Sequence, residues 1–330
     1  MNGKSILITG GTGSFGKQFV RYIVNKYKKI KRLVIYSRDE LKQHEMAQTF
    51  TEEKFPFIRY FIGDVRDYNR LKRAMNGIDI VIHAAALKHV PIAEYNPIEF
   101  IQTNVLGAQN IIEASLDTNV NTVIALSTDK AAAPINLYGA TKLCSDKLFI
   151  AANTYAGKNM KFSVVRYGNV FNSRGSVVPI FLKHKNKGYF PVTEKNMTRF
   201  NITLDEGVKL VDWVNDNSFG GEIFVPKIPS FKITDLAKAI NPKNKINFIG
   251  MRKGEKIHEE LITASDSYTT YETDKVFINL PDNDKIRISK FKSKYKKFKK
   301  VSLNFTYTSG NNKEFLSIKE LKNLLDNQIN

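Results

Sequence analysis

The feature that most constrains the fold is a glycine-rich turn near the start of the chain. An apolar run, Ser5–Ile8, leads into glycines at positions 10, 13 and 16, and a helical pattern follows over Lys17–Lys26. In such a turn the first glycine permits a tight bend, the second lets backbone approach a pyrophosphate, and the third lets helix pack on strand. The helix N-terminus then offers unpaired N–H groups to phosphate. The sequence therefore predicts a strand–turn–helix unit that binds a dinucleotide.

Apolar, strand-length runs recur through the first half of the chain, separated by helix-length segments. The predicted strands are Ser5–Ile8, Leu33–Tyr36, Tyr60–Ile62, Ile80–Ile82, Thr122–Leu126 and Phe162–Val165. This alternation implies parallel βαβ units with right-handed crossovers. We therefore predict an α/β protein with a Rossmann-type, doubly wound parallel sheet and a smaller, mixed α/β substrate-binding lobe. The expected division is a cofactor-binding domain at 1–165 and mainly the lobe at 166–330, with some chain returning to the first domain and a basic C-terminal segment.

Composition narrows the setting in which the chain works. Its 330 residues are enough for a large core, and no run of eighteen or more apolar residues predicts a membrane span. The N-terminus enters a strand almost at once, without a signal-peptide pattern, so we expect a cytoplasmic protein. The single cysteine, Cys144, fits a reducing compartment, and we expect it to be buried. The five histidines lack metal-ligand spacing, so no metal is expected.

The segment after the second predicted strand bears on the choice of cofactor. NAD sites place an acid at this strand end to bind the ribose diol, whereas an arginine there accommodates the 2′-phosphate of NADP. Ser37, Arg38 and Lys42 occupy this segment and favour NADP. Asp64 and Val65 are expected to meet the adenine, and three alanines after the fourth strand leave room for the cofactor. The predicted cofactor-binding residues are Gly10, Thr12, Gly13, Ser14, Phe15, Gly16, Ser37, Arg38, Asp39, Glu40, Leu41, Lys42, Asp64, Val65, Ala84, Ala85, Ala86, Tyr138 and Lys142.

A tyrosine and a lysine after the fifth strand form a candidate catalytic pair. Tyr138 and Lys142 are four residues apart and share one face of a predicted helix. A nearby ammonium and the positive nicotinamide both favour tyrosinate, so we predict a lowered pKa for Tyr138. Tyr138 can then take a proton from a substrate hydroxyl while hydride leaves the attached carbon.

These motifs together resemble those of the extended short-chain dehydrogenase/reductases. More narrowly, they resemble the inverting UDP-N-acetylglucosamine 4,6-dehydratases of the type that begins pseudaminic acid biosynthesis. The resemblance covers about residues 1–265, and its most specific part is Thr128-Asp129-Lys130. The matching segments are Thr9–Gly16, Ser37–Lys42, Gly63–Val65, His83–Pro91, Ser127–Ala131, Tyr138–Lys142, Arg166–Val170, Ser173–Ser176, Met197–Phe200 and Gly254–Lys256.

The resemblance implies an NADP-dependent lyase that converts UDP-N-acetylglucosamine into a UDP-2-acetamido-2,6-dideoxy-4-hexulose. The sugar would be oxidised at C4, lose water between C5 and C6, and be reduced at C6. The resemblance implies that Lys130 is the base for the C5 proton and Asp129 the acid at C6. It makes Tyr138 the base for the C4 hydroxyl, Lys142 the residue that tunes Tyr138 and holds the nicotinamide ribose, and Thr128 the group that polarises the C4 oxygen. Tyr138 also favours inversion at C5, because several retaining relatives have methionine there.

A nucleoside diphosphate sugar needs cations for its phosphates and an acceptor for its ribose hydroxyls. Arg199 and Arg252 are the candidate cations, because an arginine fork suits phosphate. Glu255 is the candidate acceptor. By resemblance, Lys88 and Asn169 contact the sugar or its pyrophosphate.

Two features depart from the resemblance. Many relatives have an aromatic residue where this chain has Asn201, which alters the packing expected near the uridine. The basic tract Lys285–Lys300 has no expected counterpart, and we interpret it as a solvated edge, with an acidic partner, an anionic membrane surface or nucleic acid as alternatives. Its interleaved Phe291, Tyr295 and Phe298 fit either base stacking or one buried face.

Other functions remain open at this point. A UDP-sugar 4-epimerase of the same fold is the main alternative, although such enzymes usually have a longer loop before the tyrosine. A non-catalytic NADP-sensing protein is another, and the complete set of candidate catalytic residues argues against it. The net charge of +19 can steer anionic substrates, and nucleic acid is not the expected partner. Because relatives associate, we expect a homo-oligomer, at least a dimer.

Overall fold

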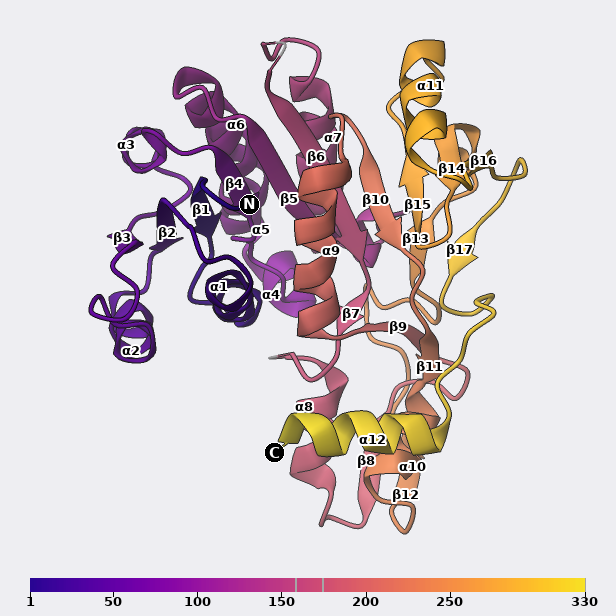
Figure 1. Ribbon diagram of the computed structural model, residues 1–330. Helices are drawn as coiled ribbons and strands as arrows, with labels where there is room; N and C mark the ends of the chain where they lie inside the picture. The colour runs from indigo at the N-terminus through magenta and orange to yellow at the C-terminus, as the bar shows by residue number, and fades with distance from the viewer. Residues whose placement is uncertain (158, 174, 330) are drawn as a thin grey trace.

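The computed structural model describes residues 1–157, 159–173 and 175–329, with side chains as far as residue 327. Arg174, which belongs to the motif Ser173–Ser176, lies outside these residues. The chain forms a large sheet flanked by helices and a smaller lobe below it (Figure 1). The predicted α/β, Rossmann-type fold is thus confirmed.

The central sheet has ten strands in the order β16-β14-β15-β10-β6-β5-β4-β1-β2-β3. The strands from β3 to β10 along this order run parallel, and β15, β14 and β16 each run antiparallel to the neighbour before them. The ten strands are β1 (Ser5–Thr9), β2 (Arg32–Ser37), β3 (Ile58–Ile62), β4 (Ile80–His83), β5 (Thr122–Thr128), β6 (Lys161–Tyr167), β10 (Ile223–Pro226), β14 (Thr270–Glu272), β15 (Val276–Asn279) and β16 (Lys299–Lys300).

Helices cover both faces of this sheet. Every residue of β1 is buried, as expected for a parallel strand covered on both sides. On one face α1 packs beside α9, and α3, α6 and α7 pack together on the other. The helices around the sheet are α1 (Ser14–Lys26), α2 (Glu40–Thr49), α3 (Tyr68–Met75), α4 (Val90–Tyr95), α5 (Pro97–Phe100), a π-helical turn (Ile101–Leu106), α6 (Gly107–Asp117), α7 (Leu137–Ala152), α9 (Leu204–Asn217), α11 (Lys285–Lys294) and two 3₁₀ turns (Asp129–Ala131 and Ser265–Thr269).

Strand order reverses between β1 and β4, because the chain proceeds from β1 to β2 and β3 on one side and to β4, β5 and β6 on the other. In open α/β sheets a ligand crevice forms at the carboxyl ends of the strands at such a reversal. The glycine-rich turn follows β1. Thr128 is the last residue of β5, and Asp129 and Lys130 follow it, so the topology brings both motifs to this edge.

The smaller lobe has its own apolar core, which includes Phe181, Phe190, Phe231, Leu236 and Leu321. The C-terminal helix α12 packs on α10 and closes this core (Figure 1). The elements of the lobe and of its connection to the sheet are β7 (Asn169–Val170), α8 (Val177–His184), β8 (Tyr189–Val192), β9 (Thr198–Ile202), β11 (Ser230–Lys232), α10 (Ile233–Ile240), β12 (Lys245–Phe248), β13 (Glu260–Ile262), β17 (Tyr307–Thr308) and α12 (Ile318–Ile329).

The basic tract forms α11 and the edge strand β16. Its aromatic side chains pack inward: the Phe291 ring lies 5.5 Å from that of Phe298, which stacks at 4.5 Å on Tyr271 of β14. Tyr295 lies 6.0 Å from Trp213 of α9. These rings hold α11 against the sheet edge, and the lysines between them are exposed.

Two further observations concern the surface. Cys144 is exposed on α7, so the expectation of a buried thiol is wrong. In the ranges that the structure describes, none of the helices has both the length and the apolar character needed to cross a bilayer.

Candidate active site

A cavity of about 890 Å³ opens between the carboxyl edge of the sheet and the smaller lobe. Its volume is in the range of cofactor and ligand pockets. All the residues predicted for catalysis and substrate binding line it, together with those predicted for the cofactor apart from Glu40 and Leu41. Those two lie in the first turn of α2, and the Leu41 side chain is largely exposed. Their role in cofactor binding stays a prediction.

The turn after β1 has the shape of a phosphate cradle. Gly10 has φ +65°, and a Cβ atom there would lie 2.9 Å from the backbone nitrogen of Ala85. A Cβ atom on Gly16 would overlap the Gly11 carbonyl. Gly13 caps α1 without a side-chain hydrogen bond, so the first N–H groups of this helix stay available to a ligand. These residues fit the pyrophosphate of a dinucleotide.

The alanine segment after β4 is fixed to this turn by Thr9. The Thr9 hydroxyl accepts hydrogen bonds from the backbone N–H groups of Ala84 and Ala85, at 3.1 and 3.2 Å. It also lies 2.9 Å from Nδ1 of His83, which is fully buried. Burial, and then the charge of Lys142, lower the pKa of His83 to about 3. A neutral His83 thus supports the floor of the cavity.

At the end of β2 the acidic and basic side chains are paired with one another. Asp39 caps α2, where its Oδ1 accepts the Lys42 N–H at 3.0 Å, and its other oxygen binds the Lys42 ammonium. The Arg38 guanidinium is half-exposed and lies 3.5 Å from Asp64, whose carboxylate also binds Arg66. The cap and Lys42 therefore engage both oxygens of Asp39, and Arg38 and Lys42 line the cavity as members of ion pairs.

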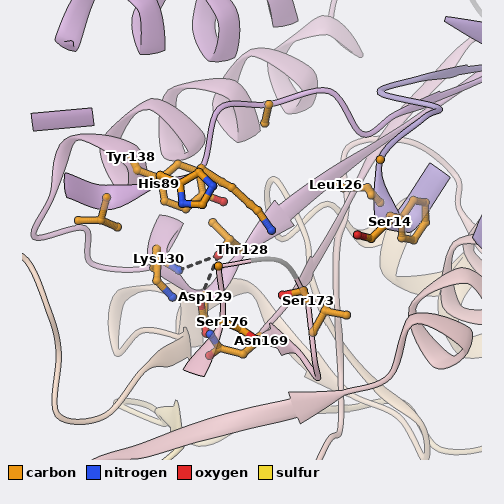
Figure 2. A pocket seen from close by; sticks show the side chains of 18 of the residues that line it. Ser14, His89, Leu126, Thr128, Asp129, Lys130, Tyr138, Asn169, Ser173 and Ser176 are labelled. Atoms are coloured by element: carbon orange, nitrogen blue, oxygen red, sulfur yellow. Dashed lines mark hydrogen bonds and ion pairs between the residues drawn. The ribbon is translucent and has the colours of Figure 1, made fainter. Parts of the chain in front are cut away.

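Figure 2 shows Thr128, Asp129 and Lys130 grouped near Asn169 and Ser176, with Ser14 and Leu126 at the opposite end of the pocket. The Thr128 hydroxyl donates to Oδ1 of Asp129 at 2.9 Å. Nζ of Lys130 lies 3.1 Å from the same Oδ1 atom. The second oxygen of Asp129 is buried and finds no hydrogen-bond partner among the described residues, so it is free to meet a ligand.

The charges of this cluster set its protonation. Burial raises the pKa of Asp129, which favours the neutral acid despite the nearby ammonium of Lys130. Burial works to lower the pKa of Lys130, but Asp129 and Glu259 outweigh it, and this pKa is raised. In the protein alone, Lys130 is therefore an ammonium beside a carboxyl group that readily takes up a proton.

Tyr138 and Lys142 lie on α7, whose first turn is capped by the Asn136 side chain accepting the Gly139 N–H at 2.8 Å. Both side chains are buried at the cavity wall. Burial raises the pKa of Tyr138 to about 12, and the Lys130 ammonium opposes this rise. In the protein alone, desolvation of the phenol outweighs the neighbouring positive charge, and the lowering predicted in the presence of the nicotinamide stays a prediction. Burial also lowers the pKa of Lys142, against the effect of Asp146 one turn further along α7.

The predicted substrate residues come from separate elements that converge on the cavity. Asn169 of β7 and Asn201 of β9 each have a buried side-chain oxygen with no partner in the described part of the chain. Arg252 and Glu255 face each other across the loop before β13, with 3.9 Å between charged atoms. Lys88 lies just before α4 and lines the same cavity.

Arg199 occupies a different environment from the one its proposed task implies. It is buried, and its Nη1 donates to the carbonyls of Thr198 and Ile257, at 2.7 and 3.1 Å. Its Nε lies 3.6 Å from Glu259. These contacts hold Arg199 in the wall of the site, and its side chain also lines the cavity.

Glu259 is the site residue that sequence reasoning missed. Its side chain is 3% exposed, and its Oε1 lies 3.1 Å from Nζ of Lys130. The available signal was the pair Glu259-Glu260 directly before the apolar residues of β13, since alternate residues of a strand point to opposite sides. That pattern shows that one of the two faces inward, but not what it meets there.

The chain has close relatives. The family model described as polysaccharide biosynthesis protein matches residues 6–281. A Campylobacter jejuni protein named UDP-N-acetylglucosamine 4,6-dehydratase (inverting) is 53% identical over 98% of both chains. A Rickettsia bellii protein named UDP-glucose 4-epimerase is 43% identical, over 98% of this chain and 96% of that one.

Among solved structures, that of Pen from Bacillus thuringiensis superposes with a TM-score of 0.88 at 36% identity, covering 99% of this chain and 98% of the other. The resemblance inferred from the motifs is confirmed, and this chain belongs to the polysaccharide biosynthesis protein family, with the fold of the extended short-chain dehydrogenase/reductases.

Proposed function

We propose that this protein is an NADP-dependent dehydratase that removes water from UDP-N-acetylglucosamine and gives a UDP-2-acetamido-2,6-dideoxy-4-hexulose. The observation that carries the proposal is the buried Asp129–Lys130 pair, which places an acid and an amine 3.1 Å apart at the cavity wall. Elimination of water needs one group to remove a proton and another to donate one to the departing oxygen. The name of the Campylobacter relative, at 53% identity, supports the same reaction and its inverting course.

The residues divide the proton transfers between them. A bound nicotinamide would supply the acceptor for the C4 hydride and the donor of hydride to C6, after which a proton returns to C5. Tyr138 takes the proton of the C4 hydroxyl, and its raised pKa means that tyrosinate forms only as substrate and cofactor bind beside it. Lys130 removes the C5 proton, acidified by the C4 ketone, and Asp129 protonates the C6 oxygen as it leaves. Thr128 stands beside them and polarises the C4 oxygen, and Lys142 holds the nicotinamide ribose.

Cofactor and substrate are assigned to opposite ends of the cavity. The cradle of Gly10, Gly13 and Gly16 fits the cofactor pyrophosphate. Arg252 and Glu255 are proposed to bind the substrate diphosphate and ribose. Lys88, Asn169 and Arg199 complete the sugar side, and the unpartnered oxygen of Asn169 supports contact with a sugar hydroxyl.

NADP is proposed over NAD because Arg38 and Lys42 both line the cavity near the end of β2, while the carboxylate of Asp39 is engaged by the cap of α2 and by Lys42. Arg38→Ala should weaken NADP binding by about 10- to 100-fold, the value of a hydrogen-bonded charge pair, and leave NAD binding nearly unchanged. Titration calorimetry with both cofactors measures this, with exposed Arg73→Ala of α3 as control. Equal affinities of the wild-type protein for NAD and NADP would contradict the choice.

Incubation with UDP-N-acetylglucosamine and NADP tests the reaction itself. We expect a product lighter by one water, with a C6 methyl group and inverted C5 configuration in its NMR spectrum. Such a product would suit the first step of pseudaminic acid biosynthesis. A sugar of unchanged mass would overturn the proposal.

A UDP-sugar 4-epimerase is the second candidate, favoured by the name of the Rickettsia relative at 43% identity. Epimerisation needs a base at C4 but no acid at C6, so it leaves the buried Asp129–Lys130 pair without a task. An isomeric sugar of the same mass in the incubation above would identify this activity.

We further propose that the protein works in the cytoplasm as a homo-oligomer. Large apolar side chains are exposed along α4 and the following turns, among them Ile92, Tyr95, Ile98 and Leu106. Such a cluster is typical of a surface that another subunit covers. Light scattering measures the mass in solution, and a monomer at all concentrations would contradict the oligomer.

A further inference from the structure

We infer that Glu259 is a positioning residue for Lys130, which it holds in place for removal of the C5 proton; the inference rests on the proposed function. Nζ of Lys130 lies 3.1 Å from Oε1 of Glu259 and 3.1 Å from Oδ1 of Asp129. Two carboxyl groups from distant parts of the chain thus hold the Lys130 nitrogen in one position. Asp129 is the neighbour of Lys130 in sequence and moves with it, so the fixed reference point comes from Glu259.

Glu259 is itself firmly anchored. Its backbone N–H donates to Oγ of Ser309 at 2.9 Å, and its carbonyl accepts the Ser309 N–H at 2.8 Å. The Ser309 hydroxyl lies 2.7 Å from that of Thr198, which also contacts His258. Contacts at the ends of β9, β13 and β17 therefore hold the backbone that carries the Glu259 side chain.

The charges around Glu259 suit this role. Burial works to raise its pKa, but Lys130 and Arg199 outweigh burial and the pKa is lowered, so Glu259 stays ionised. The residue cannot act as the acid, since Asp129 is the group whose pKa is raised. An ionised carboxylate beside Lys130 instead stabilises the ammonium that forms when this lysine takes a proton.

The proton transfers of the elimination step balance between Lys130, Asp129 and the sugar. The Lys130 ammonium first passes a proton to the Asp129 carboxylate, 3.1 Å away, which leaves a neutral amine and a neutral acid. The amine then takes the C5 proton while the acid protonates the leaving C6 oxygen, and one water departs. Lys130 ends as the ammonium and Asp129 as the carboxylate, as they began, and Glu259 stays ionised throughout.

The test separates the partial reactions in Glu259→Gln, with Glu260→Gln as the matched control. Glu260 is the adjacent acid, only partly buried, and it does not line the cavity. In Glu259→Gln we expect unchanged KM and unchanged hydride removal from C4, seen as reduced nicotinamide that accumulates. Water elimination, measured by product mass, should fall by about 10- to 100-fold, the cost of a displaced catalytic group. Glu260→Gln should match the wild-type protein in both steps.

A pH profile distinguishes positioning from a merely structural role. The charged or titratable groups that face Lys130 are Asp129, Glu259, Arg199, Lys88 and Tyr138. Loss of the Glu259 charge lowers the pKa of Lys130, so the low-pH limb of the elimination profile should move to lower pH in Glu259→Gln. Glu259→Asp keeps the charge and should leave that limb in place while it slows elimination. This variant also serves if Glu259→Gln does not fold.

Each outcome decides one of the two claims. If the wild-type protein eliminates water and both Glu259 variants do so at its rate and with its pH profile, the role of Glu259 is overturned while the proposed function stands. If the wild-type protein eliminates no water, the proposed function fails first. Elimination that is slowed together with hydride removal, without a shifted limb, marks a structural role and also overturns the inference.

Discussion

At the scale of single residues, burial decides the chemistry that the cavity can perform. Asp129 and Lys130 are neighbours in sequence, yet the same desolvation raises the pKa of one and opposes the rise in the other. Tyr138 shows the same effect, since the loss of water around its phenol outweighs the adjacent cation. The sequence supplies the residue types, whereas the solvation of each group follows from the fold.

Lys130→Ala tests the division between oxidation and elimination. The variant should still remove hydride from C4, because Tyr138 and the cofactor cradle remain, but it should release no water. Stopped-flow absorbance of reduced nicotinamide and product mass measure the two steps. The exposed lysine of α7 gives the control Lys147→Ala, which should behave as the wild-type protein. Normal turnover by Lys130→Ala would refute the role of Lys130.

His83 makes stability depend on pH. Its folded pKa of about 3 lies below the ordinary value of 6.5, so the folded state holds fewer protons between those values. Its contribution is complete above about pH 6.5 and is lost as pH falls towards 3, with a slope of at most roughly 1.4 kcal/mol per pH unit. Urea unfolding between about pH 7 and 5 should show the stability gap between wild type and His83→Gln narrowing as pH falls. A constant gap would contradict a neutral His83.

How far the site could be predicted also differs from residue to residue. The glycine spacing, the Arg38 position and the Tyr138–Lys142 pair all lie in short local patterns, and these residues line the cavity. Glu259 contacts Lys130, and Ser309 contacts Glu259, across long stretches of chain that no local pattern encodes. The exposure of Cys144 was not predicted, because helix periodicity gives relative faces but not which face meets solvent.

At the scale of elements, the contact between β1 and α1 fixes the cofactor cradle. Gly16→Ala should lower the free energy of unfolding by about 1–3 kcal/mol, the cost of overpacking, since its Cβ would overlap the Gly11 carbonyl. It should also weaken NADP binding. Gly157→Ala is the control, because a Cβ there meets no atom of the non-adjacent described residues within 4 Å and should change stability by less than about 0.5 kcal/mol. Urea denaturation measures both, and equal effects would contradict a tight contact at Gly16.

The first six strands match predicted elements because parallel strands inside the sheet are continuous apolar runs, and even the edge strand β3 is mostly apolar. The later strands are shorter and antiparallel at the sheet edge, and their partners are set by tertiary contacts. The sequence consequently indicated that some chain returns to the first domain but did not indicate that β10, β15, β14 and β16 extend its sheet.

At the scale of the whole molecule, the net charge of +19 acts on encounter with anionic ligands. Lys88, Arg252 and Lys253 line the cavity and add local positive charge. We expect kcat/KM for the UDP-sugar to fall several-fold as ionic strength rises from about 0.01 to 0.1 M, because the screening length shortens from roughly 30 to 10 Å. The value of kcat, measured in the same series, should stay constant. A parallel fall in both constants would argue against steering.

The pairing of β17 with β13 has a consequence for biosynthesis. When β15 has emerged from the ribosome, the glycine-rich turn and most of the large sheet are already outside, but Ser309 has not yet emerged. The segment behind Lys130 then lacks its anchor. During synthesis the segments that form the dinucleotide cradle are therefore free to fold before the strand partner that anchors Glu259 behind Lys130.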